Sequence, residues 1–169
     1  MSRSKPIHPE DSMLAFRACL GQFATGVTVV TCSGADGHPC GITVNSFSSV
    51  SLEPPLVLWN IAKSSNSLRD FLNTKDFAIH ILTDDQMELA LQFAKSDHTL
   101  FENIEFRKSD ADVPILPGCL AVFECSTHQV HDAGDHHIIV GHVDRFSWDR
   151  AGPLLFFSGH YRQMGEPTD

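Results

Sequence analysis

The segment Val27-Thr28-Val29-Val30-Thr31-Cys32 is rich in β-branched residues and stops at Ser33-Gly34-Ala35-Asp36-Gly37, a cluster of turn-forming residues. A second β-prone segment, Gly41-Ile42-Thr43-Val44, follows directly. Two short strands joined by such a turn predict an antiparallel hairpin, so the chain begins its core with β-structure.

The same pattern continues toward the C-terminus. Further strands are expected at residues 47–52, 56–61, 77–82, 120–130, 136–143 and 154–157, with a hairpin turn at 132–135. About eight strands joined mostly by tight turns favour a closed antiparallel barrel, because closure removes the exposed sheet edges. The predicted fold class is therefore mainly β with a few peripheral helices.

Three segments have helical periodicity. Apolar residues recur at three- and four-residue steps between Pro9 and Phe23, and a short helix is expected at residues 67–73. Thr83-Asp84-Asp85-Gln86 has the pattern of a capping box. It would open a helix whose apolar face carries Met87, Leu91 and Ala94.

The length and composition fit one globular domain over residues 1–169. The chain is 42% hydrophobic, and its 21 acidic and 12 basic residues give a net charge of -9. This charge argues against nucleic acid as a partner, since phosphate neutralisation needs clustered Lys and Arg. It also disfavours anionic membranes.

The sequence also predicts a cytoplasmic location. No apolar stretch approaches the roughly 20 residues that span a bilayer, and the polar start, residues 1–6, does not have the pattern of a secretory signal. The five cysteines, an odd number without a Cys-x-x-Cys pair, favour buried free thiols in a reducing compartment.

Several chemical signatures are missing from the sequence. It contains no G-x-G-x-x-G dinucleotide fingerprint, no P-loop, no H-E-x-x-H zinc helix and no G-x-S-x-G nucleophile elbow. The ten histidines raise a metal alternative. His128 and His137 are placed to meet across the second hairpin, but surface and core histidines are commoner, and we expect no metal site.

Hydroxyl side chains are dense in two segments, Thr43–Ser51 and Lys63–Ser67. The second precedes a predicted helix, where a lysine, hydroxyls and free backbone N–H groups are able to hold a phosphate. Simpler alternatives remain for both segments. Ser64 or Ser65 can be an N-cap alone, and the Thr43–Ser51 segment can be an ordinary polar strand edge.

Four segments, taken in order, resemble a known family. They are Phe23–Thr31, Gly41–Val57, Gly134–Val143 and Pro153–Phe157 with Gly159 and Tyr161. Together they are similar to the short-chain flavin reductases, the reductase components of two-component flavin monooxygenases, over about residues 14–162. The resemblance implies an FMN-binding split β-barrel and a homodimer with flavin near the subunit interface.

It also implies an NAD(P)H-dependent flavin reductase. Such an enzyme reduces free FMN or FAD with NADH or NADPH and passes the reduced flavin to a separate oxygenase. Carried over by position, the flavin-contacting residues are Thr43, Asn45, Ser46, Val50 and Ser51, with Lys63, Ser64 and Ser67 at the phosphate. His136 and Tyr161 would line the nicotinamide side, with His136 as the catalytic candidate. Members often carry Arg where this chain has His142, and Tyr near Phe156.

Two other functions fit the same residues. The barrel would serve either as a flavoprotein that keeps its flavin and acts on another substrate, or as a non-enzymatic flavin- or haem-binding module. His136 itself has a simpler interpretation as a solvent-facing hairpin histidine.

Overall fold

The structure, a computed structural model, describes residues 6–95 and 100–165. Residues 1–5 of the polar start lie outside this part of the chain. The elements in chain order are η1 (Pro9–Asp11), α1 (Met13–Leu20), β1 (Thr25–Gly26), β2 (Thr28–Ser33), β3 (Pro39–Val44), β4 (Ser48–Leu52), β5 (Pro55–Ala62), α2 (Leu68–Asn73), β6 (Asp76–Ile81), α3 (Met87–Phe93), β7 (Arg107–Lys108), β8 (Pro114–Ile115), β9 (Ala121–Ala133), β10 (His136–Trp148), β11 (Leu155–Phe157) and β12 (His160–Arg162).

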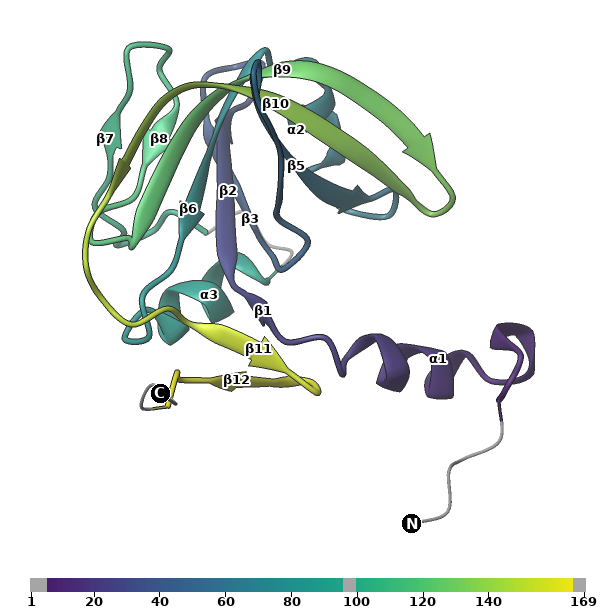
Figure 1. Ribbon diagram of the computed structural model, residues 1–169. Helices are drawn as coiled ribbons and strands as arrows, with labels where there is room; N and C mark the ends of the chain where they lie inside the picture. The colour runs from purple at the N-terminus through teal and green to yellow at the C-terminus, as the bar shows by residue number, and fades with distance from the viewer. Residues whose placement is uncertain (1–5, 96–99, 166–169) are drawn as a thin grey trace.

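Seven strands form one antiparallel sheet in the order β3-β2-β6-β9-β10-β5-β4. Figure 1 shows this sheet curling into a barrel, with β11 and β12 beneath it and the β7–β8 pair at one side. The β2–β3 hairpin forms as predicted, with Thr28 opposite Val44 and Cys32 opposite Cys40. The second predicted hairpin joins β9 to β10 through Gly134, whose φ of 65° suits glycine.

Two apolar cores stabilise the barrel. Inside it, the fully buried Trp59 packs edge-on against Phe71 and Phe77, with ring centroids 4.9 and 6.0 Å apart. A second core lies under α3, where Phe93 and Leu82 are completely buried. The two cores lie on opposite faces of β2, with Val30 and Cys32 in the first and Val29 in the second.

The helices differ from the sequence expectation in two respects. The segment from Pro9 to Phe23 divides into a 3-10 turn and the eight-residue α1, because Ser12 caps a new helix by accepting a hydrogen bond from the Ala15 N–H. The predicted buried face of α3 was wrong. Met87 and Leu91 are exposed, and Ala90 and Phe93 are buried instead.

The cap of α3 also forms only in part. Gln86 Oε1 accepts from the Thr83 N–H at 3.1 Å, but the Thr83 hydroxyl bonds to Asp85 rather than to a backbone N–H. The stripe of α3 that faces the core lies one residue earlier than the predicted one and includes Ala90 and Phe93. No helix within the described residues is long and apolar enough to span a membrane.

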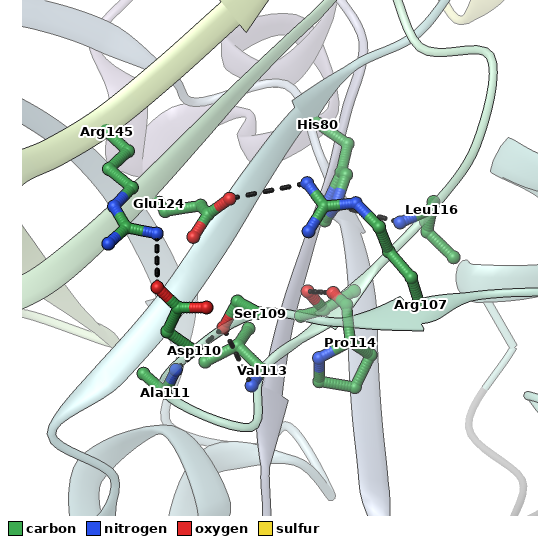
Figure 2. Close-up of polar contacts among 11 residues, drawn as sticks. His80, Arg107, Ser109, Asp110, Ala111, Val113, Pro114, Leu116, Glu124 and Arg145 are labelled. Atoms are coloured by element: carbon green, nitrogen blue, oxygen red, sulfur yellow. Dashed lines mark hydrogen bonds and ion pairs between the residues drawn. The ribbon is translucent and has the colours of Figure 1, made fainter.

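A buried histidine connects the barrel to the segment that directly follows the two-stranded β7–β8 sheet. His80 of β6 is fully buried, its Nδ1 donates to the Val29 carbonyl at 3.0 Å, and its Nε2 accepts from the Leu116 N–H at 3.1 Å. Figure 2 shows this contact beside two surface ion pairs, Arg107–Glu124 and Arg145–Asp110. Both of these pairs are largely solvent-exposed, so His80 is the stronger link.

This environment predicts a pH-dependent loss of stability. Burial lowers the pKa of His80 from 6.5 to about 4. His80 in the unfolded chain binds a proton below pH 6.5, whereas His80 in the folded chain binds one only below about pH 4. The free energy of unfolding should therefore fall as the pH drops through this window, by about 3 kcal/mol for this group.

Urea unfolding of the wild type and His80→Gln between pH 7 and pH 4 measures this contribution. We expect the variant to be less stable at pH 7 but to lose less stability on acidification, because glutamine does not titrate. Parallel pH dependences for the two proteins would show that His80 is not the responsible group.

Candidate functional site

Two clefts meet along β3, and both are lined by Ile42 and Thr43. The smaller has a volume of about 500 Å³ and the larger about 820 Å³. The Thr43 hydroxyl donates to the Ala90 carbonyl of α3 at 2.8 Å. Thr43 therefore has a fixed position between the two clefts.

The smaller cleft gathers polar groups from three strands. Asn45 and Ser46 follow β3, Asn60 lies on β5, and His136 begins β10. Ser46 Oγ accepts from the Asn60 N–H at 2.9 Å and lies 3.3 Å from the Asn60 carbonyl oxygen, to which it donates. His136 Nδ1 is 2.7 Å from Asp135 Oδ1, and the hydrogen bond lowers the pKa of Asp135. The imidazole is thus oriented at the cleft rim.

Asn60 carries an unsatisfied polar atom in this cleft. Its Oδ1 is buried and has no hydrogen-bond partner among the described residues. An orphaned buried amide oxygen costs roughly 1–3 kcal/mol, so its persistence points to a donor supplied from outside the chain. Asn60 lines the cleft, but this oxygen is enclosed, so a ligand N–H would reach it only after the side chain turns toward the cleft.

The larger cleft is rich in hydroxyl and amide groups. Ser65, Asn66 and Ser67 line it from the segment before α2, and Lys95 lines it from the end of α3. Because Gly41 of β3 has no side chain, the Phe93 ring of α3 packs directly against it. A Cβ at Gly41 would lie only 2.6 Å from Phe93 Cε1, so the missing side chain shapes the cleft floor.

His38 lines this cleft as well as Lys95. His38 Nδ1 hydrogen-bonds to Asp36, and its Nε2 lies 3.7 Å from Asp70 Oδ2. The hydrogen bond with Asp36 raises the pKa of His38 and lowers that of Asp36. The cleft thus combines Lys95 and the His38 imidazole with the carboxylates of Asp36, Asp70 and Glu102.

The comparison with known families decides the relationship. The family described as "Flavin reductase like domain" matches residues 20–165. The chain belongs to this flavin reductase family.

Individual relatives agree with the family. "FMN reductase (NADH) SmoA" of Agrobacterium fabrum is 48% identical over 147 residues, which cover 87% of this chain and 83% of the relative. The reductase component of a flavin-dependent trigonelline monooxygenase from Acinetobacter baylyi is 42% identical. The match covers 86% of this chain but 47% of that relative, so the chain spans about half of its length.

Solved structures share the fold of this flavin reductase domain. The Streptomyces globisporus NADH:FAD oxidoreductase SgcE6, solved in complex with NAD and FAD fragments, is 32% identical with a TM-score of 0.91. That match covers 98% of this chain and all of the other. The split β-barrel fold expected from the sequence is therefore confirmed.

Within this flavin reductase domain, the structure brings together five of the predicted site residues. Thr43, Asn45, Ser46 and His136 line the smaller cleft, and Thr43 and Ser67 line the larger. Their roles remain predictions. The first part of one hydroxyl-rich segment and the last part of the other line two clefts that share Ile42 and Thr43.

Five other predicted site residues lie outside both linings. Val50 and Ser51 are on β4, where the Ser51 hydroxyl accepts from the Glu53 N–H. Ser64 is exposed, and Lys63 Nζ forms an ion pair with Asp132 at 2.8 Å. A fifth residue, Tyr161, packs on Phe156 beneath the barrel, with ring centroids 5.4 Å apart.

The histidine pairing across the second hairpin does not form. His137 lies opposite Asp132, four positions along β9 from His128, because the turn at Gly134 and Asp135 fixes the register of the hairpin. Among the described residues, no three His, Cys, Asp or Glu side chains are grouped to hold a metal ion.

The sequence interpretation missed Asn60, Lys95 and His38. Asn60 had a usable signal, since it is the one amide in the apolar segment Leu56–Ile61. Lys95 and His38 had none, because only the packing of α3 against the first hairpin brings them to the same cleft.

Proposed function

We propose that this chain is an NAD(P)H:flavin oxidoreductase that reduces FMN or FAD and supplies the reduced flavin to a separate oxygenase. One observation carries the proposal: a polar cleft at Asn45, Asn60 and His136 adjoins a hydroxyl-rich cleft at Ser65–Ser67, with Thr43 between them. This shape suits a ligand with a flat ring at one end and a phosphate at the other. Relatives whose names include NADH, FMN and FAD support it.

The smaller cleft would hold the isoalloxazine ring. Thr43, Asn45 and Ser46 supply polar contacts from β3, and the unpaired Asn60 oxygen would accept the ring N–H once its side chain turns toward the cleft. His136 stands at the open side, where a nicotinamide would approach. The phosphate would lie in the larger cleft near Ser67, where Lys95 and the His38 imidazole also line the wall.

The chemistry places few demands on the protein. Hydride passes from the nicotinamide to the flavin, which accepts two electrons, so the protein supplies position and electrostatics. The reacting atoms must approach to about 3–3.5 Å. The Thr43–Ala90 and Ser46–Asn60 hydrogen bonds fix the side chains that would set this separation. No protein nucleophile is needed.

Replacement of His136 tests the assignment. If His136 orients the nicotinamide, His136→Ala should lower kcat/KM for NADH about 3- to 100-fold, the range expected for one lost positioning hydrogen bond, neutral or charged. Flavin affinity should change little. Stopped-flow reduction of the enzyme–flavin complex across NADH concentrations measures the first effect, and a fluorescence titration measures the second.

The matched control is His131→Ala, an exposed histidine on the opposite strand of the same hairpin. It should leave both quantities unchanged. Steady-state NADH oxidation with excess free FMN tests the function as a whole, because a reductase turns over many equivalents of flavin. Absence of turnover with FMN, FAD and both nicotinamides would refute the proposed function.

We also propose that the protein is a homodimer. No residue of α1 is buried, although the helix is rich in apolar side chains. Leu14 and Leu20 are 81% and 59% exposed, and the following Phe23 is 78% exposed. In Figure 1, α1 extends away from the barrel. An isolated helix of eight residues is unstable in water, so this one needs a surface to cover its apolar side chains. A second copy of the chain is the proposed surface.

Sedimentation equilibrium at micromolar concentration should give about twice the chain mass of 18.7 kDa. The double substitution Leu14→Ser and Leu20→Ser should shift the protein toward monomer, since it removes apolar area from the interface. The control Ala18→Ser adds a hydroxyl on the same helix and should leave the dimer intact. A monomeric wild type would contradict the proposal.

We propose a cytoplasmic location for the chain. All five cysteines are free in the structure, and this supports the proposal of a reducing cytoplasmic compartment.

A further inference from the structure

Two cysteines face each other in the first hairpin. Cys32 of β2 and Cys40 of β3 are register partners on adjacent antiparallel strands, so their side chains point to the same face of the sheet. Both are free thiols and belong to the core around Trp59, where Cys32 is fully buried and Cys40 is 6% exposed.

Their spacing suits a disulfide. The Gly34 N–H donates to the His38 carbonyl, and this fixes the hydrogen-bonded positions of the hairpin. Alternation along the ladder makes Cys32 and Cys40 a hydrogen-bonded pair, for which the Cα atoms are about 5.5 Å apart. That separation lies within the roughly 4.4–6.8 Å range of natural disulfides. The Cβ atoms of a hydrogen-bonded pair are about 5.5 Å apart and those of a disulfide roughly 3.5–4.5 Å, so the two strands must approach by about 1 Å for the bond to form.

The two thiols differ in access. Cys40 lines the larger cleft, whereas Cys32 lies behind it in the core. Cys40 also interacts with the Ser67 hydroxyl, and His38 and Asp70 line the same cleft. A small molecule that enters the cleft therefore reaches Cys40 first and Cys32 only through it.

The hydrogen bond between the thiols separates their acidities. It lowers the pKa of Cys40 and raises the pKa of Cys32, to which burial also contributes. The Ser67 hydrogen bond and the His38 charge favour the Cys40 thiolate, while burial and Asp70 oppose it. By comparison, burial raises the pKa of Cys125 to about 12. Since the thiolate is the nucleophile, Cys40 is the attacking group.

We propose that Cys32 and Cys40 are a redox modification site, a dithiol that hydrogen peroxide converts to a disulfide and that weakens FMN binding when oxidised. The Cys40 thiolate attacks one peroxide oxygen, the O–O bond breaks, and the departing hydroxide takes up a proton to become water. This leaves Cys40 as a sulfenic acid. The Cys32 sulfur then attacks Cys40, the S–S bond forms, and a second water leaves. Two thiols lose two electrons, and one peroxide gains them.

The oxidised pair would alter the larger cleft. A disulfide at Cys40 has no S–H and no thiolate, so its hydrogen bond with Ser67 is lost. Ser67 lines the proposed phosphate end of the flavin site, and this step of the inference rests on the proposed function. Loss of one positioning hydrogen bond should weaken FMN about 2- to 10-fold.

Thiol mapping of the full chain tests the site directly. The protein is treated with a few equivalents of hydrogen peroxide, denatured, alkylated with iodoacetamide and analysed by intact and peptide mass spectrometry. Before treatment all five cysteines should be alkylated. Afterwards three should be alkylated, and the Cys32 and Cys40 peptides should be joined with the loss of two hydrogens. Dithiothreitol should restore all five.

Single variants separate the roles of the two thiols. Cys32→Ser removes the resolving thiol, so dimedone should trap a sulfenic acid at Cys40. Cys40→Ser should give no product at Cys32. The matched control Cys125→Ala removes a third buried cysteine of the same core and should form the disulfide like the wild type. The wild-type map decides the question even if a core variant fails to fold.

Full alkylation of Cys32 and Cys40 after peroxide would overturn the site, as would oxidation confined to the exposed Cys19. Equal FMN affinity of the reduced and disulfide forms would overturn the effect on binding. Thiol mapping requires no NADH turnover, so failure of the redox site and failure of the proposed reductase activity are distinguishable.

Discussion

The Ser46 hydroxyl makes two hydrogen bonds to the backbone of Asn60, one to the N–H and one to the carbonyl. These bonds attach the link between β3 and β4 to the middle of β5, at the far side of the seven-stranded sheet. The segment that carries Thr43 and Asn45 is therefore attached to β5 as well as to β2 through the β2–β3 ladder and to α3 through the Thr43–Ala90 hydrogen bond. Asn60 also lines the smaller cleft. The contact that attaches the β3–β4 link to β5 therefore also positions a residue of the site.

Strand β3 is the shared wall of both clefts because its two faces and its end have different neighbours. Gly41 allows Phe93 of α3 to approach closely, and the Thr43 hydroxyl bonds to the same helix at Ala90. Beyond Val44 the chain leaves the ladder and presents polar side chains. A single short strand thereby serves a hydroxyl-rich cleft at one end and an amide- and imidazole-lined cleft at the other.

The local pattern of the sequence predicted much of this arrangement and failed where long-range packing decides. The two hairpins are visible in the residues because β-branched segments and glycine turns are local signals. The buried face of α3 was not, since Met87 and Leu91 have helical spacing but Ala90 and Phe93 are the residues that meet β3 and the second core. Apolar periodicity finds a helix more reliably than it finds which stripe is covered.

The candidate site shows the same division. Thr43, Asn45, Ser46 and Ser67 were predicted from hydroxyl-rich segments and family resemblance, and they line the clefts. The ion pair between Lys63 and Asp132 could not be predicted, because the two residues are 69 positions apart and no local pattern shows which carboxylate a lysine will contact. An ion pair with the hairpin tip directs that ammonium group away from the hydroxyls that follow it in sequence.

In the proposed flavin complex, the phosphate lies in the larger cleft, near Ser67 and Lys95, and the ring lies in the smaller one. Titrations of FMN and riboflavin, followed by flavin fluorescence, test it most directly with Ser67→Ala, Lys95→Ala and Lys63→Ala. The first two should weaken FMN about 10-fold or more and riboflavin little, because only FMN carries the phosphate. Lys63→Ala should not discriminate between the ligands. Selective loss of FMN binding in Lys63→Ala, with Ser67→Ala and Lys95→Ala unchanged, would show that the phosphate does not lie in the larger cleft.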